Sequence, residues 1–173
     1  MKIFVINGTG GSGKDTFIEI FKRKYHDKGT VINISTVDTI KEAAKCFFFW
    51  DGKKDEKSRK FLSDLKDLVT NYSDAPFKYI KGTIELWSDS NDAIIFIHCR
   101  EPEEIERLVK NFNAQTILID ARERVPAINS NHADSDVYEY AYDYIIDNNG
   151  SRKQLECAVE CFLEMIEEKS SLS

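Results

Sequence analysis

The sequence predicts a three-layer α/β/α fold built on a five-stranded parallel sheet. Short apolar runs alternate along the chain with segments whose apolar residues recur at helical spacing, which is typical of a parallel sheet covered on both faces. A glycine-rich segment joins the first apolar run to the first helical pattern. The length of 173 residues suits one domain with a substantial core, so we expect residues 1–173 to form a single domain.

Five apolar runs have the composition of buried strands. The run Ala93–Ile97 has no polar alternation, as expected for a strand buried on both faces of the sheet. The remaining runs are shorter and rich in Ile and Val, which suit strands. The predicted strands are residues 3–6, 31–34, 93–97, 116–119 and 144–146.

The helices are predicted from periodicity and from start signals. Pro76 and Pro102 mark helix starts, since proline suits a first helical turn, and Ser151 with Gln154 forms a capping box for the last helix. Residues 121–136 are polar and lack periodicity, so we predict a loop that acts as a lid. The last helix is expected to bury Leu155, Val159, Phe162 and Ile166. The residues that recur at helical spacing elsewhere are Phe17, Ile20, Phe21, Lys24 and Tyr25 in the first helix and Phe61, Leu62, Leu65, Leu68, Val69 and Tyr72 in a middle helix.

The segment from Gly8 to Thr16 has the spacing of a phosphate-binding P-loop, Gly-x4-Gly-Lys. Glycines let successive backbone N–H groups converge on a phosphate, the following helix start adds a positive dipole end, and Lys14 supplies a mobile charge. Asp15 stands where Ser or Thr usually holds Mg²⁺, so Asp15 and Thr16 are the candidate metal ligands, directly or through water. The predicted ATP-binding residues here are Gly8, Gly10, Gly11, Ser12, Gly13, Lys14, Asp15 and Thr16.

Further candidates follow the other predicted strands. Ligands of parallel α/β sheets bind at the carboxyl ends of the strands, so polar residues at these points are expected to share one site. They are Asp38 and Lys41 after the second strand, Arg100 after the third, Arg122 and Arg124 after the fourth, and Asn148 and Gly150 after the fifth.

The arginines suit phosphoryl transfer, because their planar forks bind two phosphate oxygens at once. We expect Arg122 and Arg124 to close over the reaction; the alternative is that they are solvated loop charges. Arg100 is expected to bind the acceptor phosphate rather than a neighbouring glutamate. Asp38, Lys41 and Arg59 complete the predicted acceptor site, and His98 is either a core histidine or a site residue.

Composition limits the partners. A net charge of −6 disfavours general nucleic-acid or membrane binding, and no apolar run approaches the roughly 20 residues that span a bilayer. We therefore expect a cytoplasmic monomer or homodimer. Cys157 and Cys161 lack a matching metal-ligand pair and are expected beside a core helix face. The run Phe47–Trp50 is expected in core and rim packing, with base stacking as the alternative.

The string Ser12-Gly13-Lys14-Asp15-Thr16 resembles the phosphate loop of phage-type deoxynucleoside monophosphate kinases and of animal phosphomevalonate kinases. Both belong to the nucleoside monophosphate kinase group of P-loop folds, with adenylate kinase and dephospho-CoA kinase. The segments His132–Asp136 and Tyr142–Ser151 resemble the stretch that, in this group, runs from the lid into the last strand and the adenine-contacting turn. Residues 43–92 carry no matching motif.

The resemblance implies an ATP- and Mg²⁺-dependent kinase of an adenylate kinase-like fold, in which residues 36–92 bind the acceptor. One departure is clear: the group usually has Asp-x-Arg after the third strand, whereas this chain has His98-Cys99-Arg100. The expected reaction moves the γ-phosphoryl of ATP to a phosphate or hydroxyl group of a small acceptor, and the leading candidate is a (deoxy)nucleoside monophosphate. The alternatives are a dephospho-CoA kinase-like enzyme and a regulatory protein that holds ATP without transferring it; an ATPase tied to nucleic acid is disfavoured by the acidic charge.

Overall fold

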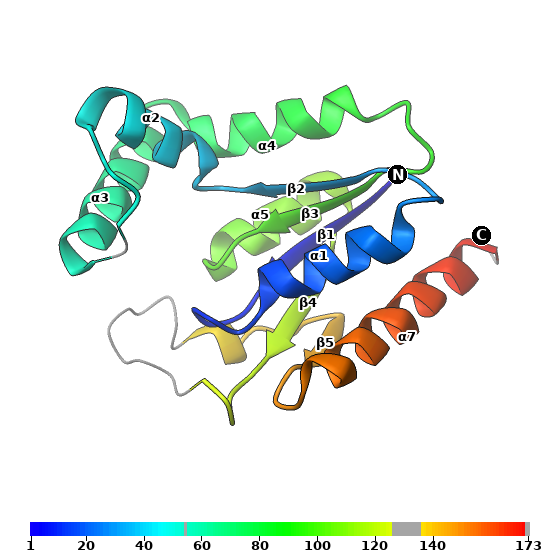
Figure 1. The fold of residues 1–173 in the computed structure, drawn as a ribbon. Coiled ribbons are helices and arrows are strands. Elements are labelled where there is room, and N and C mark those ends of the chain that lie inside the picture. Colours follow the sequence, from blue (N-terminus) through cyan, green and yellow to red (C-terminus); the bar gives the residue numbers. More distant parts are fainter. Residues whose placement is uncertain (54, 126–135, 172–173) are drawn as a thin grey trace. The chain divides into compact units, whose positions relative to one another are not determined.

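The computed structural model describes residues 1–53, 55–125 and 136–171, which divide into two compact units (Figure 1). The first unit consists of residues 1–33 and 91–173, and the second of residues 34–90. The first contains the glycine-rich loop and most of the sheet. The second consists mainly of helices, so each unit has its own interior.

The sheet has five strands in the order β2-β3-β1-β4-β5. All five predicted strands are confirmed to within one residue at each end, and the fold class is confirmed with them. The pairings of β1 with β3, of β1 with β4 and of β4 with β5 are parallel. The carboxyl end of the central β1 is therefore flanked by the ends of β3 and β4. The strands are β1 (Lys2–Asn7), β2 (Val31–Ser35), β3 (Ile94–His98), β4 (Gln115–Asp120) and β5 (Tyr144–Asp147).

Helices cover both faces of the sheet in the first unit (Figure 1). Helices α1 (Lys14–Tyr25) and α7 (Arg152–Ser171) pack together on one face, and α5 (Pro102–Phe112) lies on the other against β1 and β4. A short 3-10 helix, η1 (Asp136–Tyr138), precedes β5. The predicted capping box is confirmed, since Ser151 N donates to Gln154 Oε1 at 2.7 Å and Gln154 N donates to Ser151 Oγ at 3.4 Å.

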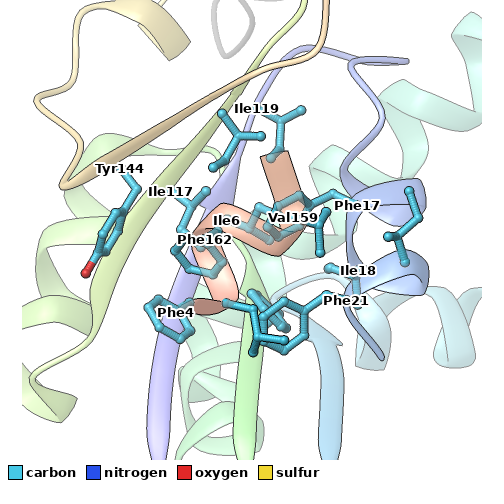
Figure 2. Close-up of a cluster of buried hydrophobic side chains, with 14 of the residues drawn as sticks. Phe4, Ile6, Phe17, Ile18, Phe21, Ile117, Ile119, Tyr144, Val159 and Phe162 are labelled. Atoms are coloured by element: carbon cyan, nitrogen blue, oxygen red, sulfur yellow. The ribbon is translucent and has the colours of Figure 1, made fainter. Parts of the chain in front are cut away.

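An aromatic cluster fills the space between the sheet and the α1/α7 face (Figure 2). Phe4 of β1 stacks on Phe96 of β3 with ring centroids 5.6 Å apart, and Phe162 of α7 lies edge-on to Phe4 at 5.3 Å. Phe17 and Phe21 of α1 are fully buried in the same cluster. Because α1 is packed by these rings, the loop that precedes it is anchored at both ends.

The second unit contains α2 (Asp38–Phe48), α3 (Glu56–Ser73) and α4 (Ala75–Leu86). The predicted proline start of α4 is confirmed, with Pro76 in its first turn. The interior of the unit is small, and α3 leaves Leu68 and Tyr72 exposed despite their helical spacing. The buried apolar side chains of α2 and α4 are Ile40, Ala44, Pro76, Ile80 and Ile84.

The packing prediction for the aromatic run at the end of α2 is wrong for Phe47 and Phe49, which are 75% and 90% exposed. Phe48 is 54% exposed, and its ring packs edge-on to Phe61 of α3 with centroids 5.4 Å apart, as expected for rim packing. The helix ends at Phe48, and Phe49 adopts a left-handed conformation with φ of 57°, which turns the chain away. Trp50 is half-buried, and its indole N–H donates to the carbonyl of Lys53 at 3.0 Å.

The predicted placement of Cys157 and Cys161 beside the core is also wrong, since both are exposed. The buried stripe of α7 contains the four predicted residues Leu155, Val159, Phe162 and Ile166 together with Leu163, and the two cysteines fall outside it. No helix within the described ranges is long and apolar enough to cross a membrane.

Candidate functional site

The glycine-rich loop connects β1 to α1, and its backbone needs glycine. Gly8, Gly11 and Gly13 have positive φ values of 150°, 82° and 96°, a region that other residues rarely adopt. A Cβ on Gly8 would also lie 2.5 Å from Ser12 Oγ and 2.8 Å from the carbonyl oxygen of Ile119. Glycine is therefore required at Gly8 both for its positive φ and for its close packing, and at Gly11 and Gly13 for their positive φ values.

The N-terminus of α1 opens at this loop. Gly13 is the N-cap residue and has no side chain to accept from the first backbone N–H groups of the helix. The hydroxyls of Thr9 and Ser12 are buried and lack hydrogen-bond partners among the described residues. Unpaired backbone N–H groups at a helix start, together with the helix dipole, favour a phosphate ligand.

Lys14 lies at the start of α1, as predicted. Its ammonium group donates to the carbonyl oxygens of Gly8 at 2.5 Å and Thr9 at 3.0 Å, so the side chain curls back over the loop. The side chain is half-buried rather than part of the core. This arrangement places a cation beside the phosphate-binding amides of the loop.

Asp15 and His98 approach each other beside the start of α1. Nε2 of His98, the last residue of β3, lies 3.6 Å from Oδ1 of Asp15, whose side chain is 86% exposed. Thr16 is half-buried on the next position of α1. The structure thus places His98 at the site edge, where the resembled group has a carboxylate. The role of Asp15 and Thr16 as metal ligands stays a prediction.

Arg124 and Asn148 reach the glycine-rich loop from the carboxyl edge of the sheet. Nη2 of Arg124 donates to the carbonyl oxygen of Ser12 at 3.3 Å and to that of Gly11 at 3.5 Å, and Nε donates to that of Asn148 at 3.1 Å. Nδ2 of Asn148 donates to the carbonyl oxygen of Ser12 at 2.7 Å. Two candidates far apart in sequence from the loop therefore contact it directly.

The local structure explains why position 150 is a glycine. A Cβ at this position would overlap Gln154 Oε1, the acceptor in the capping box of α7. A side chain at this position would therefore displace Gln154 from the capping box, independently of any ligand.

Arg122 is held away from the loop backbone. Its guanidinium donates to Oδ2 of Asp120 from Nε at 3.0 Å and from Nη2 at 2.5 Å, and to Oδ1 from Nε at 3.1 Å. It also lies 4.6 Å from the ring centroid of Tyr138. The hydrogen bonds from Arg122 hold the pKa of Asp120 below its usual range. Arg122 and Arg124 thus point to different partners, and Asp120 is a residue that the sequence analysis missed.

Stability should depend on Asp120 in a pH-dependent way. A carboxyl whose pKa is lowered on folding stabilises the protein above its unfolded pKa of about 3.9, and this contribution is lost as the pH falls through the lower folded value. Since Arg122 is 58% exposed, we expect Asp120→Asn to lower the free energy of unfolding by only about 1 kcal/mol at pH 7. The difference from wild type should shrink below about pH 4.

Denaturant unfolding at a series of pH values measures this difference. Asp89→Asn removes an exposed carboxylate of the second unit and serves as the control, with no comparable loss at pH 7. A deficit of Asp120→Asn that is equal at pH 7 and pH 3 would show that Arg122 does not set the ionisation of Asp120.

The remaining candidates are divided between the two units. Arg100 belongs to the first unit and lies two residues after His98, the last residue of β3. Asp38, Lys41 and Arg59 belong to the helical unit, where Asp38 Oδ2 accepts from Ser35 N at 2.7 Å. Their role in acceptor binding, like that of residues 36–92 as a whole, stays a prediction. Residues 126–135 of the predicted lid, and most of the segment His132–Asp136, lie outside the described residues.

Solved structures share this fold. Dephospho-CoA kinase from Campylobacter jejuni is 20% identical with a TM-score of 0.54, and the match covers 95% of this chain and 97% of that one. Shikimate kinase from Aquifex aeolicus is 14% identical with a TM-score of 0.51, and the match covers 98% of both chains. No family model and no curated protein matches the sequence. The five-stranded sheet, the glycine-rich loop and these similarities together show that the chain has the fold of P-loop kinases.

Proposed function

We propose that this protein is an ATP-dependent small-molecule kinase that transfers the γ-phosphoryl group to a phosphate-bearing acceptor. The leading candidate for the acceptor is a (deoxy)nucleoside monophosphate. The observation that carries the proposal is the glycine-rich loop at the start of α1, with Lys14 curled over it and Arg124 on its carbonyl oxygens. Backbone amides and cations grouped around an open helix start are typical of a site that binds a polyphosphate.

In this proposal the loop amides and Lys14 hold the β- and γ-phosphates of ATP. The phosphates would compete with the carbonyl oxygens of Gly8 and Thr9 for the Lys14 ammonium, and charge favours the phosphates. Asn148 and Gly150 would border the adenine, as the resemblance implies. Arg122 would reach a phosphate only by leaving the carboxylate of Asp120. The hydrogen bonds of Arg124 go to backbone carbonyl oxygens rather than to a carboxylate, which makes Arg124 the stronger candidate for binding the transferred phosphoryl group.

The residues at the start of α1 fit a hydrated Mg²⁺ ion. The Asp15 carboxylate is exposed beside the loop, and the Thr16 hydroxyl follows it. Such an ion, when bound, supplies charge neutralisation on the phosphates of ATP. Asp15 and Thr16 would hold it, directly or through water.

Transfer breaks the bond between the γ-phosphorus and the β–γ bridging oxygen and forms one to an oxygen of the acceptor, leaving ADP. A phosphate acceptor is already an anion and needs no strong base, so the histidine at position 98 is compatible with this chemistry. Arg100 would orient the acceptor phosphate.

Measuring ADP release with a panel of acceptors tests the proposal. The panel contains nucleoside and deoxynucleoside monophosphates and dephospho-CoA, with Mg²⁺ and ATP present. Acceleration by a nucleoside monophosphate is the expected result, and acceleration by dephospho-CoA alone would select the alternative substrate. ATP binding without any acceptor-stimulated ADP release would identify a regulatory nucleotide-binding protein and overturn the proposal.

Arg100→Ala should raise the KM for the acceptor far more than the KM for ATP. A charge-assisted, two-pronged contact is worth about 1.5–3 kcal/mol, so the acceptor KM should rise about 10- to 100-fold. Steady-state kinetics with each substrate varied in turn measures both constants. Lys110→Ala removes an exposed cation of the nearby α5 as the control and should change neither constant. An equal rise in both KM values for Arg100→Ala would rule out a specific acceptor contact.

A further inference from the structure

A hydrogen-bonded junction lies at the carboxyl end of β1, directly before the glycine-rich loop. Its centre is Asn7, which is 1% exposed. Oδ1 of Asn7 accepts from the backbone N–H of Gly8 at 2.7 Å. Nδ2 donates to the hydroxyl of Tyr142 at 2.8 Å and to the carbonyl oxygen of Arg100 at 3.3 Å. The amide therefore uses its oxygen and both of its N–H groups.

Tyr142 extends this junction to the segment before β5. Its hydroxyl donates to the carbonyl oxygen of Val137, a fully buried residue of η1, at 2.8 Å. Burial raises the pKa of Tyr142 to about 12, so the phenol keeps the proton that it donates. The next residue of η1, Tyr138, lies under the guanidinium of Arg122.

The junction thus joins three backbone segments that meet at one edge of the sheet. They are the first residue of the phosphate loop, the backbone of Arg100 after β3, and η1 before β5. All belong to the first compact unit. Two of these segments would bind different substrates in the proposed reaction: the loop would hold ATP, and Arg100 would hold the acceptor.

We infer that Asn7 and Tyr142 are positioning residues that hold the phosphate loop and the acceptor arginine in one fixed arrangement for phosphoryl transfer. The inference rests on the proposed function. Neither side chain touches a substrate in this scheme; each acts through Gly8, Arg100 and η1. Phosphoryl transfer depends mainly on the placement of donor and acceptor, and a misplacement of about 1 Å can reduce the rate about 100-fold.

Asparagine suits the central position for a chemical reason. One side chain must accept from an N–H group and donate to two oxygen atoms, which an amide can do and a carboxylate cannot. Asn7→Asp retains the acceptor for Gly8 but loses both donors and buries a charge beside the carbonyl oxygen of Arg100. Tyr142→Phe is the milder change, because the ring remains and only the hydroxyl is lost.

The first experiment compares Tyr142→Phe with Tyr140→Phe. The two rings lie edge-on with centroids 5.0 Å apart, so Tyr140→Phe is a matched loss of a hydroxyl that leaves the bonds to Asn7 and Val137 in place. We expect kcat of Tyr142→Phe to fall about 10- to 100-fold while its ATP dissociation constant changes less than about threefold. Tyr140→Phe should match wild type in both.

The second experiment is a double-variant cycle with Asn7→Asp. If the two residues act through one junction, the loss of kcat in the double variant should be close to that of the worse single variant, rather than the product of the two losses. Should Asn7→Asp fold poorly, Asn7→Ser replaces it in the cycle. Independent, multiplying losses would contradict a shared positioning role.

A third measurement does not depend on turnover. Hydrogen exchange of the loop amides from Gly8 to Gly13 should be about 10-fold faster in Tyr142→Phe than in wild type or Tyr140→Phe. Unchanged exchange, or unchanged kcat in an active enzyme, would overturn the inference. If wild type transfers no phosphoryl group to any acceptor, the proposed function fails, whereas faster exchange in Tyr142→Phe would still establish that the junction holds the loop.

Discussion

Lys14→Ala is expected to reduce ATP turnover at least about 100-fold while the protein remains folded. The ammonium of Lys14 supplies the mobile charge beside the loop amides, and alanine leaves the negative charge that develops on the phosphates without this partner. The fold should survive because the Lys14 side chain is half-buried and donates to the loop carbonyl oxygens of Gly8 and Thr9, outside the aromatic core. ADP release and thermal unfolding measure the two effects.

Lys22→Ala provides the matched control, since it removes an exposed lysine from the same helix. Both variants should unfold within about 2 °C of wild type, because surface substitutions change stability by only about 0.5 kcal/mol. Turnover by Lys14→Ala equal to that of Lys22→Ala would remove the phosphate-loop assignment. A large loss of stability in Lys14→Ala would instead point to a structural role for its bonds to the loop.

Gly8→Ala is expected to produce the largest loss of stability of any single-methyl addition in the loop. The added Cβ would lie 2.8 Å from the backbone carbonyl oxygen of Ile119 and 2.5 Å from Ser12 Oγ, and the φ of 150° is strained for alanine. Since Ile119 belongs to the buried strand β4, its carbonyl cannot move away easily. We expect a decrease of about 2–4 kcal/mol in the free energy of unfolding and weaker ATP binding.

Gly10→Ala is the control for this substitution. A Cβ on Gly10 meets no atom within 4 Å, and its φ is not in the left-handed region, so the variant should unfold like wild type. Denaturant unfolding and ATP titration of both variants test the difference. Equal stability of Gly8→Ala and Gly10→Ala would mean that the loop does not pack against β4 as described.

Local patterns in the sequence were sufficient for the fold class and for the strands. A run such as Ile94–Ile97 has no polar alternation, because both of its faces are covered, and this signal is independent of distant residues. The phosphate loop was predictable for the same reason: its glycines and Lys14 are consecutive in the chain, and their function depends on local backbone geometry. The placement of Pro76, Pro102 and the capping box also followed from neighbouring residues.

Burial in the helical unit was not predictable from spacing. Phe47 and Phe49 have the composition of a core segment, yet both are exposed, because α2 ends at Phe48 and the chain turns at Phe49. The exposure of Cys157 and Cys161 depended likewise on which face of α7 met the sheet. Spacing gives the period of a helix, whereas the neighbouring elements decide how wide the buried stripe is.

Which partner each polar side chain takes was decided by the tertiary structure. The sequence alone determined that Arg122 and Arg124 follow a buried strand, but only the fold pairs Arg122 with Asp120 and places Arg124 on the loop. Asn7 and Tyr142 are 135 positions apart, and their contact exists because the chain that connects the carboxyl end of β4 to the amino end of β5 lies against the carboxyl end of β1. Hydrogen bonds between such residues depend on strand order and register, which no single segment of this chain encodes.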